Sequence, residues 1–326
     1  IIATGAKSRN LPFVKSDGIN VWDYKTAMTP QDLPNSLVII GSGAIGMEFA
    51  SFYNDLGVKV TVIETLTNIL PNEDEDISKI VQNNFIKRGI DIRTSTSLKS
   101  VKIDNNSVSS EISKDGINEL IKSEKLILAV GIIANTENIG LEKFNIKIDK
   151  GHIITNEYLE TEEKGIYAIG DVTGGPWLAH KASHEAILCV EKIAGLSNLT
   201  PLDKSSIPGC TYCRPQVASI GLTEKAAKIK QINIKVGKFP FIGNGKAIAM
   251  GESEGLIKTI FNKDTGELVG AHMVGPEVTE LIQGFSIAKK LETTEHELMH
   301  TIFPHPTLSE GMHESVLDAY NQAIHY

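Results

Sequence analysis

The stretch from Ser36 to Glu64 constrains the fold more than any other part of the chain. It reads SLVIIGSGAIGMEFA and then, after a short gap, VKVTVIE. A G-x-G-x-x-G at Gly41, Gly43 and Gly46 follows one apolar run, precedes a helical pattern and is followed by a second apolar run that ends in an acid. Glycines at this spacing permit a tight turn, let a phosphate approach the backbone, and let a helix pack closely on a strand. The sequence therefore predicts a parallel βαβ unit that binds an adenine dinucleotide.

The acid at the end of the second run indicates which dinucleotide binds. Glu64 lies close to the spacing of about 20 residues at which a carboxylate accepts hydrogen bonds from the adenosine ribose. The same carboxylate would repel a 2′-phosphate, so the sequence favours NAD over NADP. The residues that we expect to bind NAD are Gly41, Ser42, Gly43, Ala44, Ile45, Gly46, Glu48, Glu64, Leu98 and Gly131. A glycine-rich turn without a ligand is the alternative for the loop, and an exposed helix acid is the alternative for Glu48.

Strands and helices alternate along the first part of the chain. The expected helices cover 45–56 and 77–85, and the expected strands cover 36–40, 58–63, 90–92 and 126–130. Two weakly apolar stretches near Val101 and Val108 flank a turn at Asn105 and Asn106. This order predicts a parallel sheet with crossover helices.

The remainder of the chain has a different pattern. Residues 134–201 are less regular and hold a predicted strand in GIYAIGDV and a predicted helix over 179–193. Antiparallel strands are then predicted in QVASIGL, NIKVGKFPF, GLIKTIF and LVGAHMVG, followed by helices near 278–290 and 310–323. We therefore expect an α/β fold in three domains: a Rossmann-like NAD-binding domain in 1–133, a less regular central domain in 134–201, and an α+β domain in 202–326.

Charge and composition exclude several classes of protein. The 326 residues carry 32 Lys and Arg against 40 Asp and Glu, a net charge of −8, which argues against a nucleic-acid or anionic-membrane partner. No apolar run approaches the roughly 20 residues of a membrane span. The chain opens on IIATGAKSRNLPF, in which 1–3 resembles a buried strand, and we expect that an upstream domain is lacking. The three cysteines fit a reducing compartment.

A second glycine–acid pair, Gly170 and Asp171, ends a predicted strand. A strand that ends in Gly-Asp can aim the carboxylate at a sugar hydroxyl. The helix predicted to begin near Leu178 can direct its N–H groups at an electron-rich ring. From the residues alone, a second ligand site and a simple turn both stay open.

The pattern T-x-x-x-G-I-Y-A-I-G-D-V resembles the second flavin motif of the FAD-dependent pyridine nucleotide–disulfide oxidoreductases. The opening A-T-G-A is similar to the A-T-G segment of that family, where the chain leaves the FAD domain. The resemblance implies that Asp171 binds the ribityl chain of FAD and that 177–180 run beside the isoalloxazine ring. The implied FAD residues are Thr4, Gly5, Ala6, Asp171, Trp177, Leu178, Ala179 and His180.

The segment FPHPTLSEGMHES contains the sharpest catalytic candidate, His305. Thr307 and Glu310 have capping-box spacing, with Thr307 as the N-cap of a helix, and this is one interpretation of Glu310. In the other, the Glu310 carboxylate orients His305 and raises its basicity. H-P-T-x-x-E near a C-terminus resembles the acid/base motif of the same family, which implies that His305 exchanges protons with a dithiol across a dimer interface.

The cysteines are interpreted as structural. Cys210 and Cys213 form a C-x-x-C, but zinc would need two further ligands at useful spacing, and we expect no metal. The motif precedes a strand rather than opening a helix, unlike a thioredoxin-type site. The family's first G-x-G-x-x-G and its C-x-x-x-x-C disulfide are absent from the sequence, and Ile132 stands where the family often has arginine. Without those motifs we expect neither tight FAD binding nor thiol–disulfide exchange from this chain alone.

The form HPTLSE, together with the NAD-type Glu64, resembles the dihydrolipoamide dehydrogenases more than the glutathione reductases. The resemblance implies a homodimer that oxidises dihydrolipoamide and reduces NAD⁺ through FAD and a disulfide. It also implies that 134–201 is a central FAD-contacting domain and that 202–326 is the dimerisation domain. Implied partners are the dihydrolipoyl domains of 2-oxo-acid dehydrogenase complexes or the glycine cleavage system, in the bacterial cytoplasm or the mitochondrial matrix. The alternatives are a glutathione- or mercuric-reductase-like enzyme, or a non-catalytic NAD-binding and dimerisation module.

Overall fold

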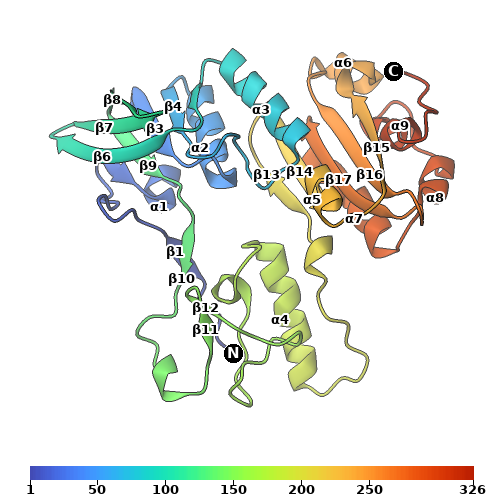
Figure 1. Cartoon of the computed structure of the whole chain (residues 1–326), viewed down its shortest axis with the longest axis horizontal. Coiled ribbons are helices and arrows are strands. Elements are labelled where there is room, and N and C mark those ends of the chain that lie inside the picture. The colour runs from blue at the N-terminus through green and yellow to red at the C-terminus, as the bar shows by residue number, and fades with distance from the viewer. The chain divides into compact units, whose positions relative to one another are not determined.

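The computed structural model describes all 326 residues and divides into two compact units (Figure 1). The smaller unit joins Ile1–Arg9 to Gly131–Ile207, and the larger unit joins Asn10–Val130 to Pro208–Tyr326. The predicted α/β class with a C-terminal α+β part is confirmed, whereas the domain boundaries at 133 and 201 stay predictions. None of the helices combines the length and hydrophobicity that a membrane crossing needs.

A parallel sheet with strand order β2-β9-β3-β4-β5 forms the first part of the larger unit. Its strands are β2 (Val21–Trp22), β3 (Ser36–Ile40), β4 (Lys59–Ile63), β5 (Asp91–Arg93) and β9 (Lys125–Leu128), and its helices are α1 (Tyr24–Met28), α2 (Ala44–Asp55) and α3 (Glu75–Lys87). β3 and β4 are buried from their second residue onward because both faces of the sheet are covered. Ile40 pairs with Ile63, so the residues that follow them, Gly41 and Glu64, reach the same edge of the sheet.

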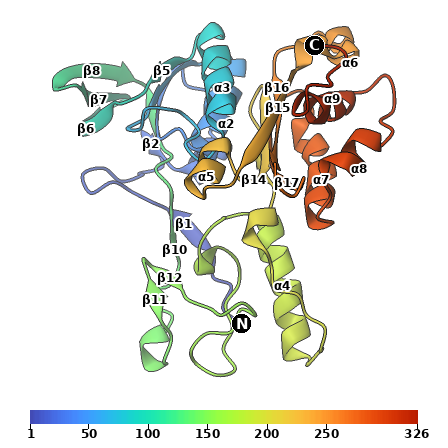
Figure 2. The ribbon, with the colours of Figure 1, turned by 45° about the vertical axis from the view of Figure 1, so that its right-hand side comes forward.

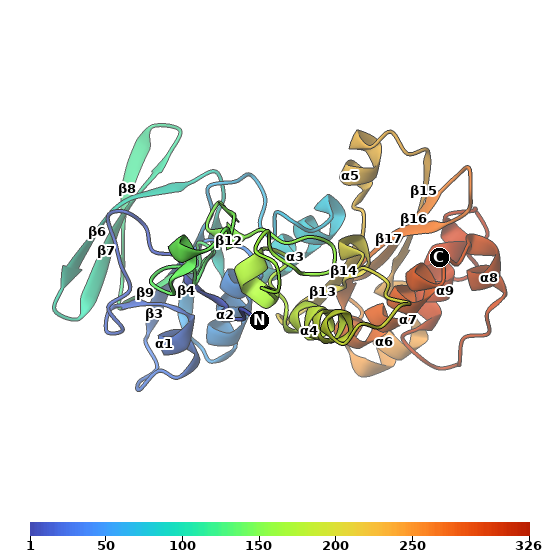
Figure 3. The same cartoon turned by 90° about the horizontal axis from the view of Figure 1, so that it is seen from below.

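A separate antiparallel sheet of three strands follows β5 and extends at the edge of this part (Figure 3). It consists of β6 (Ser97–Asp104), β7 (Ser107–Lys114) and β8 (Ile117–Ser123). Asn105 turns the chain between β6 and β7 with a φ of 37°, as the Asn-Asn pair predicts. Val108 and Ile112 of β7 bury their side chains in the apolar cluster that also holds residues of β3 and β9.

The second part of the larger unit is an antiparallel sheet with strand order β13-β14-β17-β16-β15. Its strands are β13 (Gly209–Thr211), β14 (Gln216–Gly221), β15 (Ile234–Pro240), β16 (Leu256–Asn262) and β17 (Leu268–Gly275). Its helices are α5 (Glu224–Ile229), α6 (Gly245–Met250), α7 (Val278–Lys290), α8 (Glu295–His300) and α9 (Glu310–Asp318). α7 and α9 cover one face of the sheet, and α3 packs against β17 from the other (Figure 2). Every residue of β17 is buried in consequence.

The last predicted helix is too long. α9 ends at Asp318 rather than at residue 323, because the chain turns at Asn321, whose φ is 59°. The N–H groups of Tyr320 and Asn321 bond to Leu317 and Asp318 in this turn instead of continuing the helical pattern.

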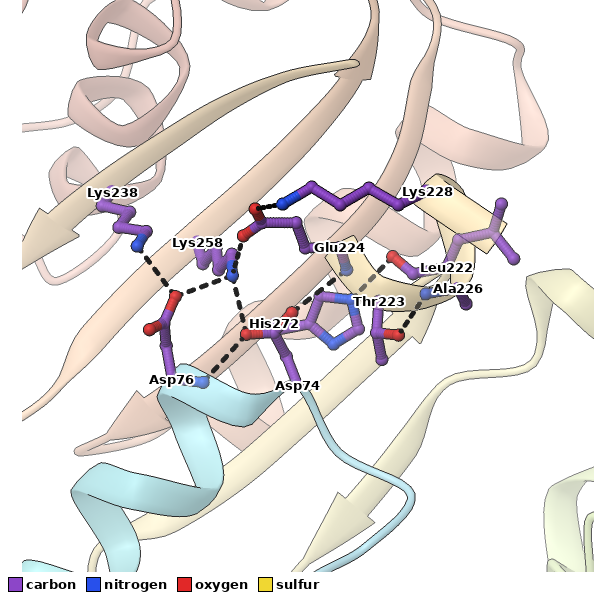
Figure 4. A network of polar contacts seen from close by, with 10 residues as sticks. All are labelled: Asp74, Asp76, Leu222, Thr223, Glu224, Ala226, Lys228, Lys238, Lys258 and His272. Carbon is purple, nitrogen blue, oxygen red and sulfur yellow. Dashed lines mark hydrogen bonds and ion pairs between the residues drawn. The ribbon is translucent and has the colours of Figure 1, made fainter. Parts of the chain in front are cut away.

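A buried lysine joins the two parts of the larger unit (Figure 4). Lys258 on β16 donates hydrogen bonds of 2.7 Å to Asp74, Asp76 and Glu224. Asp74 is also the N-cap of α3, where its side chain accepts from the Asp76 N–H. Its second oxygen accepts from the N–H of Glu224, the first residue of α5, at 3.1 Å. One carboxylate therefore holds the first turns of two helices and the lysine between them.

The smaller unit contains short strands and one long helix. β1 (Ala6–Ser8) pairs with β10 (Ile132–Ala134), and β11 (Ile148–Asp149) pairs with β12 (His152–Ile153). The helix, α4, covers Ala179–Ile193, the bounds predicted from the sequence.

Two predicted strands in this unit are wrong. The opening residues form a single bridge, from Ile2 to Ala168, and Ile1 is 61% exposed. The run GIYAIGDV forms isolated bridges at Tyr167 and Ala168 and then a 3-10 turn over Gly170–Thr173. Each run is apolar enough for a strand, but its partners span only one or two residues, so no ladder forms.

Candidate functional site

The glycine-rich loop between β3 and α2 has two glycines that the fold requires and one that it does not. Gly41 has a φ of +99°, and a Cβ there would lie 2.3 Å from the Ala129 carbonyl oxygen. A Cβ on Gly46 would lie 2.0 Å from the Gly41 oxygen, because α2 packs closely on the loop. A Cβ on Gly43 would meet nothing within 4 Å, and its φ of −67° suits any residue. The missing side chain of Gly43 therefore leaves room for a ligand.

The start of α2 offers the groups that a pyrophosphate needs. Gly43 is the N-cap and provides no side-chain cap. The first N–H groups of a helix have no partner within it, and they carry the positive end of the helix dipole. Ala44 and Ile45 are exposed in this first turn. The residues present thus fit the phosphates of an adenine dinucleotide.

Glu64 follows β4, and its carboxylate closes onto the same loop. One oxygen accepts from the N–H and the hydroxyl of Ser42 at 2.9 and 2.7 Å. The other accepts from the Leu66 N–H at 2.8 Å and the Thr65 hydroxyl at 3.1 Å. Burial raises the pKa of Glu64, but these hydrogen bonds outweigh it and hold the pKa below its usual value. The carboxylate is therefore ionised, and ribose hydroxyls can bind it by replacing the two hydroxyl donors.

The other three NAD candidates have different surroundings. Glu48 is half-buried and accepts a hydrogen bond of 2.9 Å from the Tyr212 N–H, and burial raises its pKa, so it is not an exposed helix acid. Leu98 packs against the apolar cluster beneath β6. Gly131 belongs to the smaller unit, where its carbonyl accepts from the Arg9 N–H at 2.9 Å. The structure brings the loop and Glu64 together, and a role in NAD binding stays a prediction for these residues as it does for Glu48, Leu98 and Gly131.

The Gly170–Thr173 turn of the smaller unit presents Asp171, whose carboxylate makes no hydrogen bond or ion pair within the chain. Lys181 and Glu185 of α4 form hydrogen bonds with the main chain of this turn. Sequence reasoning missed both residues. A Lys and a Glu four residues apart on the first turns of a helix after Gly-Asp were the available signal.

The remaining FAD candidates lie around the same unit. The Thr4 hydroxyl donates to the Asn135 carbonyl at 2.7 Å, and Gly5 has a φ of +68° with open space at its Cβ position. Trp177 is 47% exposed and lies beside the His152 ring, with centroids 6.0 Å apart. Ala6 begins β1, Leu178 is the N-cap of α4 without a side-chain cap, and Ala179 and His180 are exposed in its first turn. A free carboxylate, a half-exposed indole and an open helix N-terminus fit a ligand that carries hydroxyls and an electron-rich ring.

His305 and Glu310 form the pair that the sequence predicts. The imidazole Nδ1 lies 2.9 Å from Glu310 Oε1. Glu310 Oε2 accepts from the Thr307 N–H at 2.9 Å, so the reach-back half of a capping box is also present. The predicted N-cap is wrong: Ser309 precedes α9, and the Thr307 hydroxyl donates to the Pro304 carbonyl at 2.6 Å. Glu310 therefore contacts the His305 ring through one carboxylate oxygen and the Thr307 main chain through the other, the predicted capping box is not formed, and the role of Glu310 in raising the basicity of His305 stays a prediction.

This geometry fixes the chemistry available to the histidine. Burial raises the pKa of Glu310, but hydrogen bonds from the Thr307 N–H and from His305 outweigh it and lower the pKa. An ionised Glu310 accepts a hydrogen bond from Nδ1–H of the neutral imidazole. The free lone pair of the ring is then on Nε2. The His305 side chain is 78% exposed, so Nε2 can meet a substrate. Sequence reasoning missed Asn244, a buried residue whose amide donates to the Thr307 carbonyl at 3.1 Å and holds this loop.

The cysteines have no reactive environment. All three are free, and Cys189 and Cys213 are buried. Burial raises the pKa of Cys213 to about 12 and also raises the pKa of Cys210, so both thiols stay protonated at neutral pH. No group of three or more His, Cys, Asp or Glu side chains is arranged to hold a metal ion.

Comparison with known protein families shows which of them the sequence matches. Residues 1–186 match the pyridine nucleotide-disulphide oxidoreductase family, and residues 207–316 match the dimerisation domain of the same family. The chain belongs to the pyridine nucleotide-disulphide oxidoreductases. Members of this family use FAD and NAD(H), the two cofactors that the sequence predicts.

Three bacterial relatives bear the name dihydrolipoyl dehydrogenase. The Rhizobium etli protein is 55% identical over 99% of this chain and 68% of its own length. The Zymomonas mobilis protein is 53% identical over 100% of this chain and 70% of its length, and the Bacillus subtilis protein 45% identical over 100% and 69%. The expectation of a lacking upstream domain is not confirmed by these matches.

Two solved structures share the fold. LpdA from Mycobacterium tuberculosis has a TM-score of 0.89 and 27% identity, over 96% of this chain and 68% of that one. The flavoprotein disulfide reductase RclA from Escherichia coli, solved as a Cu(II) complex, has a TM-score of 0.88 and 25% identity, over 96% of this chain and 70% of that one.

Proposed function

We propose that the complete protein is a dihydrolipoamide dehydrogenase. It oxidises dihydrolipoamide to lipoamide and reduces NAD⁺ to NADH through FAD and a redox-active disulfide. Dihydrolipoamide loses two electrons and two protons; NAD⁺ takes both electrons and one proton as hydride, and the second proton leaves to solvent. Relatives of this name at 45–55% identity over nearly the whole chain support the proposal. The observation that carries it is the His305–Glu310 contact of 2.9 Å on an exposed loop.

His305 handles the protons of the dithiol. Its Nε2 accepts the proton as the first thiol attacks the disulfide, and the resulting imidazolium donates it to the departing sulfur or to water. Glu310 stabilises that imidazolium through Nδ1 and keeps the ring in one orientation. The residues that hold this loop, Asn244 and Thr307, fix the distance from which the base acts.

Separate residues bind the two cofactors. The start of α2 and Gly43 hold the pyrophosphate of NAD, and Glu64 binds the adenosine ribose and disfavours a 2′-phosphate. With FAD bound, Asp171 would accept a hydrogen bond from a hydroxyl of its ribityl chain, and the N–H groups at the start of α4 would serve the flavin ring. When bound, FAD supplies the two-electron relay between dithiol chemistry and hydride transfer.

The dimerisation domain supports a homodimer. We further propose that His305 acts on the partner subunit and that the substrate is the dihydrolipoyl domain of a 2-oxo-acid dehydrogenase complex or of the glycine cleavage system. A bacterial cytoplasm or a mitochondrial matrix is the proposed location. The division into 1–133, 134–201 and 202–326 is proposed as the functional one, for NAD, FAD and dimer contact respectively.

Substrate assays of the complete gene product test the reaction. We expect the highest kcat/KM with dihydrolipoamide and NAD⁺, and little turnover of glutathione disulfide or mercuric ion with either reduced nicotinamide. A higher kcat/KM with one of those two would transfer the protein to another branch of the family. His305→Gln should lower kcat by roughly 100-fold or more, the scale of a lost general base. The matched control is His300→Gln on α8, which changes an exposed histidine whose Nδ1 contacts only the His296 carbonyl.

For the 326 residues alone, a non-catalytic NAD-binding and dimerisation module is the second candidate, because all three cysteines are free and no C-x-x-x-x-C is present. Titration with NADH, mass in solution and NADH-dependent dye reduction with added FAD test it. Binding without dye reduction supports the module, and rapid dye reduction contradicts it.

A further inference from the structure

Two charged side chains lie in the interior of the smaller unit. Lys181 and Glu185 are one turn apart on α4, their side chains are 0% and 3% exposed, and Lys181 Nζ lies 3.0 Å from Glu185 Oε1. Burying two charges removes them from water, and the attraction between them offsets this only when their other hydrogen-bonding groups are also satisfied. Apolar residues of similar volume would pack here without that requirement. The contacts that the pair makes therefore indicate why charges occupy this position.

All remaining contacts of the pair go to one turn, Gly170–Gly174. Lys181 Nζ donates to the Gly174 carbonyl at 2.9 Å and to the Gly170 carbonyl and the Thr173 hydroxyl at 3.3 Å. Glu185 Oε2 accepts from the Gly170 N–H at 2.7 Å. The lysine thus gathers three acceptors, and the glutamate takes the one donor that the lysine cannot bind. An apolar pair would leave the buried Gly170 N–H and the Gly174 carbonyl without these partners, whereas the Gly170 carbonyl would keep its hydrogen bond of 2.8 Å from the Thr173 hydroxyl.

The turn held in this way is the one that presents Asp171. Gly170 and Gly174 have φ values of +76° and +99°, so the main chain reverses on either side of the aspartate. The Asp171 carboxylate has no partner within the chain. Its direction is consequently set by the main chain of the turn, and that main chain is set by Lys181 and Glu185.

We propose that Lys181 and Glu185 are positioning residues for the flavin: they hold the turn so that the Asp171 carboxylate meets a hydroxyl of the FAD chain. This inference rests on the proposed function in taking FAD as the ligand. Neither residue touches the cofactor in this scheme. Their effect passes through the Asp171 carboxylate, and it is separable from a general role in stabilising the unit.

FAD affinity of the complete protein is the direct test. The apoprotein is titrated with FAD, and binding is followed by flavin fluorescence and by the visible absorption band. Lys181→Met and Glu185→Gln should each weaken FAD binding by about tenfold or more, the scale of one or two lost charged hydrogen bonds. Ser183→Ala, on the same helix but bonded only to the Ala179 carbonyl, should leave it unchanged.

A double-mutant cycle separates positioning from bulk stability. If the pair acts through Asp171, then Asp171→Asn combined with Lys181→Met should bind FAD no more weakly than Asp171→Asn alone. Additive losses would overturn the proposal. Lys181→Met/Glu185→Leu removes both charges and leaves neither one unpaired, so it should recover thermal stability relative to Lys181→Met but not FAD affinity. Wild-type FAD affinity in this variant would show that the pair is structural only.

The outcome is distinguishable from failure of the proposed function. If the wild-type protein binds FAD but does not oxidise dihydrolipoamide, the reaction is wrong and the FAD titrations still decide the roles of Lys181 and Glu185. If wild-type protein does not bind FAD at all, both are wrong.

Discussion

Replacing Lys258 with Met should destabilise the larger unit strongly, because the lysine is the only cation that contacts the buried Asp74. The two side chains are each 2% exposed and their charged atoms are 2.7 Å apart. Burial lowers the pKa of Lys258, but its hydrogen bonds to Asp74, Asp76 and Glu224 outweigh this and raise the pKa, so the lysine is charged. Methionine fills a similar volume without supplying charge, and the Asp74 carboxylate then stays buried without a counterion.

The size of the loss follows from the burial of each contact. Breaking a buried pair by removing one partner costs about 3–5 kcal/mol of unfolding free energy. The contacts to Asp76 and Glu224, whose side chains are 37% and 26% exposed, add at most about 1 kcal/mol after screening by solvent. We therefore expect a loss of about 4 kcal/mol, or a Tm lower by roughly 8–16 °C.

Urea unfolding followed by circular dichroism measures this loss. The matched control is Lys225→Met, which removes an exposed lysine 3.2 Å from Glu75 on the same helix pair, with side chains 71% and 65% exposed. Exposed pairs contribute about 0–1 kcal/mol, so this variant should unfold nearly as the wild type does. Asp74→Asn added to Lys258→Met should recover part of the stability, because asparagine still caps α3 and leaves no buried charge. A loss below about 1 kcal/mol in Lys258→Met, or no recovery in the double variant, would refute the reasoning.

Three further predictions concern the dinucleotide loop and a buried histidine. Gly43→Val should weaken NADH binding in a fluorescence titration and leave the melting temperature near that of the wild type. Gly41→Ala, whose Cβ would lie 2.3 Å from a carbonyl oxygen, should lower the melting temperature. Equal losses of melting temperature in the two variants would contradict the assignment of Gly43 to the ligand and Gly41 to the fold. Glu64→Ala should reduce the preference for NAD⁺ over NADP⁺ in steady-state kinetics, and an unchanged ratio would count against a ribose contact. Burial lowers the pKa of His272 from 6.5, so the unfolded chain binds the extra proton first and stability should fall as the pH drops below 6.5. The slope should be smaller in His272→Gln, measured by urea unfolding at several pH values.

Local pattern was sufficient for those elements whose partners are near in sequence or whose apolar face is continuous. β3 and β4 are predictable because both faces of a parallel strand are buried, and α4 because its residues from Ala179 to Ile193 include no Gly or Pro that would break a helix. The segment 166–169 has the same apolar character as a strand, yet only isolated bridges form, because each neighbouring segment pairs with it at a single residue, Ile2 on one side and Glu160 on the other. Strand formation depends on a neighbour, and the segment's own residues do not encode one.

The site shows the same division between local and tertiary information. The glycine spacing and the His305–Glu310 pair lie within short segments, so motif reading finds them. The Tyr212 N–H that donates to Glu48 lies 164 residues from it in the sequence, and no local pattern predicts this contact. From the sequence, Lys181 is expected to be an exposed lysine of an amphipathic helix. Only the structure shows that its Nζ donates to the Gly170–Gly174 turn.

The double attachment of Glu310 has a consequence for the motion of its histidine. One oxygen of Glu310 contacts the His305 ring, and the other accepts from the Thr307 main chain just before α9. The orientation of the ring is therefore set by the first residue of the helix. A side chain that is 78% exposed is thereby restrained by a partner whose own side chain is only 29% exposed. In the reaction proposed above, the imidazole would then exchange a proton without a search for its orientation, because the conformational entropy of that search is lost when the chain folds and not at each turnover.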